Sequence, residues 1–192
     1  MGNALEHYIH SLVELEQKIS KEEKLKRIIE EMKTIIIGRG ESIENKVLKN
    51  GDVLDSDINV RDANEVLLYE CENVNTDPTT GYKGGILAEG EYFAIYHWHK
   101  GKYPALKIFN QVDVERLERI KRSSNLTRAE RTLPSNVGNP NHKGEFIIQD
   151  VNIHKCGDNS DWSHGCITIY YRNWDEFMKC FEVGEIVRVI LK

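Results

Sequence analysis

The first forty residues carry apolar side chains at helical spacing. The apolar positions that recur every three or four residues are Leu5, Ile9, Leu12, Val13, Leu25, Ile28, Ile29, Met32 and Ile36. Two capping boxes, which mark helix starts, accompany them: Asn3 with Glu6 and Ser20 with Glu23. The pattern over 1–40 predicts two helices, either a hairpin or one long rod kinked near Ser20, with Gly38 closing the second. Because an apolar stripe must be buried, we expect packing on the main domain, on a partner protein or on a second copy of this chain.

From residue 41 the pattern changes to the alternation and the short apolar runs of strands. The predicted strands lie at 65–74, at 90–110 as a hairpin, at 144–154, at 166–171 and at 184–192. Helices are predicted at 112–122 and 173–182, and the polar stretch 123–144 is predicted to be an irregular loop. The sequence therefore predicts an α+β, mostly β fold, with a helical element at 1–40 and a β-rich domain at 41–192.

Composition and charge narrow the functional classes. The 192 residues include 26 Lys and Arg against 31 Asp and Glu, a formal net charge of −5, so no nucleic-acid partner is expected. No apolar run approaches the roughly 18 residues that cross a bilayer, so no membrane span is predicted. The charged N-terminus also lacks the apolar stretch of a signal peptide. A secreted protein would have lost its signal or would use another export route.

The candidate chemistry lies in the stretch NIHKCGDNSDWSHGCITI, which holds His154, Cys156, His164 and Cys166. Four nitrogen and sulfur ligands are what a tetrahedral zinc site takes, but zinc ligand pairs are usually separated by two to four residues and here one intervenes. A disulfide between Cys156 and Cys166 would close the loop between them and leave the histidines unexplained. The third alternative is a cysteine nucleophile with a histidine base.

The nucleophile hypothesis accounts for the most residues. Gly165 permits a tight turn immediately before Cys166, and the backbone N–H groups of such a turn can hold an oxyanion. Cys166 opens one predicted strand and His154 ends another, so the two can face each other across the loop. His97 and His99, beside the turn of the hairpin, are either exposed at its tip or part of the cleft.

SHGCITI resembles the signature of the L,D-transpeptidase (YkuD-type) catalytic domain, and GEFIIQDVNIH resembles the strand region that carries that family's first histidine. The resemblance covers roughly 65–192 and implies a β-rich YkuD fold acting on peptidoglycan stem peptides through a thioester, in the cell envelope and without a cofactor. By position it makes Cys166 the nucleophile, His154 the base and His164 a supporting residue. The residues that it assigns to substrate or oxyanion contact are Ser163, Gly165, Thr168 and Trp162.

Two features differ from the family pattern. The histidine precedes the cysteine by twelve positions, a shorter interval than usual, and Thr168 stands where Arg or Asn is common. Trp162 has a second interpretation, as a packing residue under the loop.

Other functional classes make different predictions. A papain-like amidase places its cysteine before its histidine, and no histidine follows His164, so Cys166 does not fit that order. A zinc-stapled or catalytically inactive envelope-binding module stays open as a non-enzymatic alternative. A delivered antibacterial effector is a variant of the enzyme hypothesis, because it needs no signal peptide.

Overall fold

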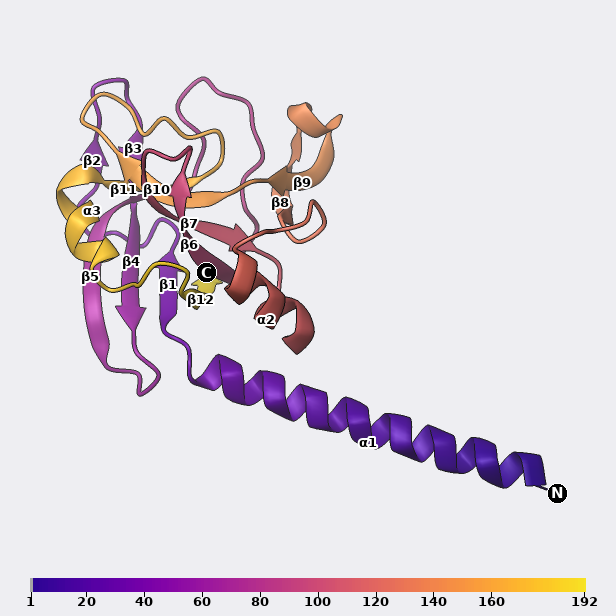
Figure 1. Cartoon of the computed structure of the whole chain (residues 1–192). Coiled ribbons are helices and arrows are strands. Elements are labelled where there is room, and N and C mark those ends of the chain that lie inside the picture. The colour runs from indigo at the N-terminus through magenta and orange to yellow at the C-terminus, as the bar shows by residue number, and fades with distance from the viewer. Residues whose placement is uncertain (1) are drawn as a thin grey trace.

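The computed structural model describes residues 2–192, in which eight strands close into a barrel (Figure 1). In hydrogen-bonded order they are β1 (Thr34–Gly38), β12 (Ile186–Leu191), β6 (Gly90–His99), β7 (Tyr103–Phe109), β10 (Asn152–Cys156), β11 (Ile167–Tyr170), β5 (Leu67–Asn75) and β4 (Ser56–Arg61). Two neighbouring pairs are parallel, β1 with β12 and β10 with β11, and the others are antiparallel. The fold is therefore mixed and mostly β, as the sequence predicts.

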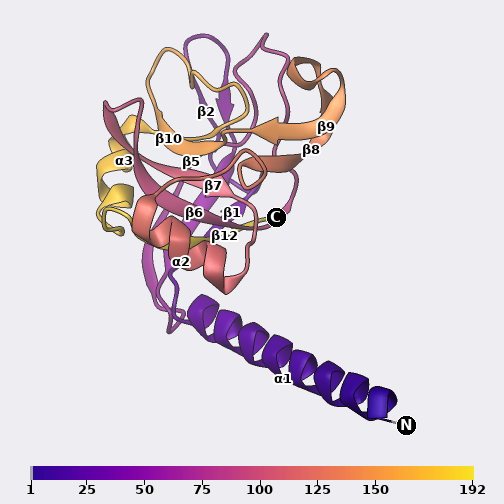
Figure 2. The same ribbon diagram turned by 45° about the vertical axis from the view of Figure 1, so that its right-hand side comes forward.

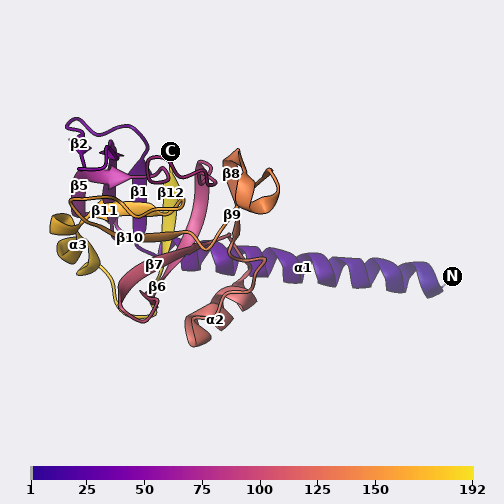
Figure 3. The same ribbon diagram turned by 90° about the horizontal axis from the view of Figure 1, so that it is seen from above.

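Smaller elements surround the barrel (Figure 2). They are the ribbon of β2 (Lys46–Val47) with β3 (Val53–Leu54), the ribbon of β8 (Thr132–Asn139) with β9 (Glu145–Gln149), the 3-10 turn Pro140–His142, and the helices α1 (Gly2–Glu30), α2 (Val114–Ser123) and α3 (Tyr171–Met178). Helix α2 lies near the foot of the barrel, whereas α1 extends away from it in all three views (Figure 3). Within residues 2–192, no helix combines the length and the apolar content needed to cross a bilayer.

Alternation along the strands separates two apolar clusters. The inner cluster fills the barrel with residues such as Ile35, Ile37, Leu106, Ile108, Ile153, Ile167, Ile169 and Val187, and α3 adds Trp174 and Phe177. The outer cluster joins Phe93, Ile95, Phe109 and Ile186 to Leu117 and Ile120 of α2 and to Leu25, Ile28, Ile29 and Met32 at the end of α1. Each fully buried side chain of this kind stabilises the fold by about 1.5–3 kcal/mol.

The N-terminal segment differs from the predicted hairpin or kinked rod. Helix α1 passes through Ser20 without interruption and ends at Glu30. Thr34–Gly38, predicted as the end of a second helix, forms β1 between β12 and β4. Four consecutive β-branched residues, Thr34 to Ile37, favour the extended backbone, and Gly38 ends the strand. The boundary between helix and barrel thus precedes Thr34 and does not lie at residue 40.

Most other predicted elements are confirmed. The hairpin at 90–110 is β6 and β7, and the helix at 112–122 is α2, whose N-cap Asp113 accepts a hydrogen bond from the N–H of Arg116. The predicted loop at 123–144 is wrong in part, because Thr132–Asn139 pairs with β9. Helix α3 begins at Tyr171, two residues before the predicted start at Asn173, and its start has no side-chain cap.

Candidate functional site

The candidate site lies on the outer face of the barrel wall, across β6, β7, β10 and β11. Ile153 pairs with Ile167 across the parallel strands, and both point into the core. Because side chains alternate along a strand, Asn152 and Cys166, one residue before each, point outward. The site is therefore built on strands that the buried core holds in place.

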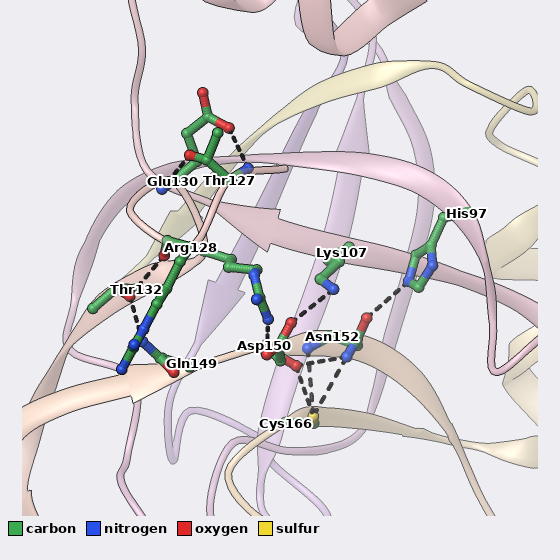
Figure 4. A network of polar contacts seen from close by, with 11 residues as sticks. His97, Lys107, Thr127, Arg128, Glu130, Thr132, Gln149, Asp150, Asn152 and Cys166 are labelled. Atoms are coloured by element: carbon green, nitrogen blue, oxygen red, sulfur yellow. Dashed lines mark hydrogen bonds and ion pairs between the residues drawn. The ribbon is translucent and has the colours of Figure 1, made fainter. Parts of the chain in front are cut away.

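Cys166 faces a cavity of about 940 Å³. Its half-buried Sγ accepts a hydrogen bond from the backbone N–H of Asn152 at 3.4 Å and lies 3.9 Å from the side-chain Nδ2 of the same residue (Figure 4). The thiol donates to the carbonyl oxygen of Asp150 at 3.9 Å. Burial raises the pKa of Cys166, and the Asn152 donors oppose that rise. The sulfur is thus a thiol at rest, with donors in place for a thiolate.

Asn152 links Cys166 to His97. The Oδ1 of Asn152 lies 2.8 Å from Nε2 of His97, and because a carbonyl oxygen only accepts, Nε2 carries the hydrogen (Figure 4). Nδ2 of Asn152 also donates to the Asp150 carbonyl at 2.7 Å. Burial lowers the pKa of His97. These bonds fix the amide with its N–H side toward the sulfur. Asn152 was not among the residues predicted from the sequence, although its place two residues before His154 on one strand is the signal that indicates it.

His154 lies on the same outer face, two residues along β10 from Asn152. Its Nδ1 donates to the carbonyl oxygen of Lys155 at 3.0 Å, which leaves the lone pair on Nε2. Burial lowers the pKa of His154 to about 4, so the ring is neutral near pH 7. The ring of His99 stacks beside it, with centroids 5.7 Å apart. His154 is therefore a neutral imidazole with a free basic nitrogen.

The structure brings His154 and Cys166 to one cavity but not into contact. His154 pairs with Thr168, two residues beyond Cys166. Strand rise and spacing then put the two Cα atoms about 8 Å apart, one diagonal step on the sheet. Within the described residues no hydrogen bond joins the two side chains. In unliganded sites, catalytic hydrogen bonds are often long and tighten only when substrate binds.

The turn before Cys166 depends on Gly165. Its φ is +114°, and a Cβ added there would lie 2.4 Å from the carbonyl oxygen of Gly85. The hydroxyl of Ser163 accepts from the N–H of Gly165 at 3.1 Å and donates to the carbonyl of Cys166 at 2.6 Å. Ser163 thus ties the turn together, and only glycine fits at its centre.

The residues predicted to contact substrate fall into two groups. Ser163 and Thr168 are fully buried and lie outside the cavity wall, which differs from the prediction. Trp162 and His164 do line the cavity: Trp162 is 75% exposed, and His164 stacks on Tyr82 with centroids 3.8 Å apart. The rings of Trp162 and His164 form an aromatic rim of the cavity. His164 lies against Tyr82 rather than in contact with the sulfur.

A buried acidic network supports the loop that carries this rim. Asp161 accepts hydrogen bonds from Asn75 Nδ2 at 2.6 Å, from the Ser163 N–H at 3.1 Å and from the Thr79 hydroxyl. Burial raises the pKa of Asp161 to about 6. Asp52 accepts from the backbone N–H of Asp161 at 3.0 Å. The hydrogen bonds accepted by Asp161 and Asp52 therefore stabilise the loop that leads to the turn at Gly165.

The wall of the cavity carries an excess of positive charge. Its charged side chains are Lys100, Lys107, Lys155 and Asp150. Asp150 is already paired with Lys107 at 2.8 Å (Figure 4). It also pairs with Arg131. Two lysines thus stay available to an anionic group such as a substrate carboxylate.

The zinc and disulfide alternatives do not fit this geometry. Cys156 pairs with Tyr170, four residues beyond Cys166, so about 13 Å of strand separates the two cysteines. A disulfide needs Cα atoms within about 7 Å, and both thiols are free. In residues 2–192, no three His, Cys, Asp or Glu side chains cluster as metal ligands, so the four candidate ligands do not form a zinc site.

Comparison of the chain with protein-family models, with curated proteins and with solved structures finds no match.

Proposed function

We propose that this protein is a cysteine acyltransferase with a YkuD-like domain, acting on peptidoglycan stem peptides as an L,D-transpeptidase or L,D-carboxypeptidase. The observation that carries the proposal is the Sγ of Cys166 facing a 940 Å³ cavity, 3.4 Å from the N–H of Asn152. The sequence resemblance supplies the substrate class. The cell envelope is the proposed location, reached by export or by delivery into another cell.

In the proposed first step, Nε2 of His154 takes the proton from Cys166. A change of side-chain rotamer on the same sheet face carries the imidazole toward the sulfur. The thiolate attacks the carbonyl carbon of a diaminopimelate–D-alanine bond, and the C–N bond breaks. D-alanine leaves with the proton from His154, and a thioester remains on Cys166. An amine acceptor or water then releases the acyl group and restores the thiol.

Asn152 and the turn stabilise the charges that develop. The two N–H groups of Asn152 stabilise the thiolate, and His97 keeps the amide oriented. The N–H of Gly165 is held by Ser163 Oγ, so the proposal assigns the oxyanion to the N–H groups of His164 and Cys166. Lys100 and Lys155 attract the carboxylate of the donor peptide.

A second candidate function is a catalytically inactive module that binds the cell envelope. The observation that favours it is the raised pKa of Cys166 together with the gap to His154. Such a module would bind a stem peptide through the lysines and the aromatic rim without releasing D-alanine.

The test is intact-mass spectrometry after incubation with a carbapenem, which acylates cysteines of this kind. The parent protein is expected to gain one adduct, and Cys166→Ala none. Cys180→Ala is the matched control, because it removes another half-buried thiol of raised pKa outside the cavity. An adduct that persists in Cys166→Ala, or a parent protein that stays unmodified, contradicts the assignment of Cys166 as the nucleophile.

D-alanine release from a stem tetrapeptide separates the two functions. The enzyme releases D-alanine in a manner that depends on Cys166, whereas the inactive module binds the peptide equally well with Cys166→Ala and releases nothing. Toxicity on periplasmic but not on cytoplasmic expression would support the delivered effector.

A further inference from the structure

Helix α1 has two halves with different surroundings. From residue 21 onward it is attached to the body: Lys21 and Lys24 pair with Glu115 and Glu118 of α2 at 2.9 Å. In the same half Leu25, Ile28 and Ile29 pack on the outer apolar cluster, as does Met32 just after the helix. Before residue 20 the helix projects into solvent in every view (Figures 1, 2 and 3).

The projecting half carries an exposed apolar stripe. Tyr8, Leu12, Leu15 and Ile19 are all exposed and follow one another at intervals of four, three and four residues. This is the a and d pattern of a coiled coil, with Leu12 and Ile19 at a and with Tyr8 and Leu15 at d. Most of the stability of a helix in a protein comes from the packing of its apolar face, so an uncovered stripe leaves this half of α1 without that contribution.

The stripe ends where the helix docks on its own body. The next d and a positions hold Glu22 and Lys26, both charged. The d position after these is Ile29, which packs with Leu25 and Ile28 on the outer apolar cluster. The charged residues Glu22 and Lys26 therefore separate the exposed stripe from the intramolecular contact.

The flanking charges point to a second copy of the chain as the occupant. In a parallel pair, a g residue faces the e residue five positions further along the partner helix. Lys18 is at g and Glu23 is at e, so each helix would supply one lysine and one glutamate, and two ion pairs would form by symmetry. Lys18 now reaches only Glu22 of its own turn, at 4.0 Å and well exposed.

A membrane surface fits less well. Residues 2–20 contain one lysine and three glutamates, so the segment is acidic. Helices that lie on anionic bilayers instead carry lysine and arginine on the polar face.

We propose that the chain forms a parallel homodimer through the projecting half of α1, with Tyr8, Leu12, Leu15 and Ile19 in the seam and with Lys18 paired, at the end of the seam, with Glu23 of the second copy. The arrangement places two barrels at the same end of a short two-helix stalk. Each cavity stays open, because its lining residues start at His97 and none comes from α1.

Sedimentation velocity of the full chain over a wide concentration range tests the dimer. The mass is expected to rise from 22.2 kDa toward twice that value as concentration increases. A mass that stays at one chain throughout overturns the proposal, as does a monomer that binds phosphatidylglycerol vesicles through Leu12.

Leu12→Glu and Val13→Glu form a matched pair. The two side chains are 43% and 44% exposed, but Val13 lies off the seam. Leu12→Glu is expected to raise the dimer dissociation constant more than about a hundredfold, whereas Val13→Glu should leave it unchanged. An equal change of the dimer dissociation constant in the two variants would overturn the assignment of the seam residues. Thermal unfolding of the barrel should be the same in both, because neither residue contacts it.

Charge reversal tests the orientation. Lys18→Glu and Glu23→Lys should each weaken the dimer, and the double variant should restore it, because the pair re-forms with opposite sign. A double variant as weak as the single variants overturns the parallel arrangement. None of these positions belongs to the cavity, so failure here leaves the acyltransferase proposal unaffected.

Discussion

Asn152→Leu removes the side-chain amide between Cys166 and His97 and keeps a similar shape. The variant loses the Nδ2 donor at 3.9 Å from Sγ and the Oδ1 acceptor at 2.8 Å from His97. It keeps the backbone N–H at 3.4 Å. We therefore expect the pKa of Cys166 to rise further and its reactivity to fall without being lost.

The magnitude follows from the geometry. A hydrogen bond to a charged group contributes about 1.5–3 kcal/mol at good distance, and a separation of 3.9 Å reduces this to about 1 kcal/mol. The thiolate fraction of Cys166 near neutral pH should then fall about fivefold. The free energy of unfolding should also fall, by about 1–3 kcal/mol, because His97 and the carbonyl of Asp150 each lose a partner.

The assay is the rate of iodoacetamide alkylation against pH, read at the peptide that contains Cys166. Gln149→Leu is the control, because it also removes a partly buried side-chain amide. This amide lies away from the sulfur and donates to the hydroxyl of Thr132 at 2.6 Å. The control should lose stability and keep the parent's alkylation profile. An Asn152→Leu profile that overlays the parent would refute the donor role.

Other predictions concern the loop and pH. Gly165→Ala should lower the free energy of unfolding by about 2–4 kcal/mol in urea titrations, whereas Gly81→Ala, with φ +85° and open space around it, should cost about 1 kcal/mol. Because the pKa of Asp161 is raised to about 6, its contribution of about 3 kcal/mol is present below pH 4 and lost as pH rises to 6. Because the pKa of His154 is lowered to about 4, about 3 kcal/mol is lost as pH falls from 6.5 to 4. Compared with the parent, stability should therefore rise more steeply with pH across this window in Asp161→Asn and less steeply in His154→Gln; equal slopes in the two variants would contradict the assignment.

Sequence patterns predicted the elements whose local periodicity agrees with their secondary structure in the folded protein. The hairpin of β6 and β7 and the helix α2 have one periodicity each and were found. Strand β1 was missed because Met32 and Ile36 continue the four-residue spacing of α1, so the helical period hid the β-branched run. Its β identity depends on pairing with β4 and with β12, and β12 is more than 140 residues away.

For the candidate site, too, the sequence predicted the contacts between residues close in the chain and not those between distant strands. The turn before Cys166 was predicted because Ser163 and Gly165 lie close to Cys166 in the chain. Asn152 and His97 were not paired with the sulfur, because their proximity arises only from the register of four strands. Thr168 is likewise buried between His154 of β10 and Asn75 of β5, and no local pattern records these pairings.

The position of the cavity on the outside of the barrel wall has a consequence for access. A pocket at a barrel mouth admits the end of a molecule, whereas an outer wall lets a long polymer lie across it at any point along its length. The proposed substrate could thus reach the cavity around Cys166 through a side branch, without a free chain end. Core substitutions that conserve volume can also leave the outward residues in place, because inner and outer faces belong to alternate positions.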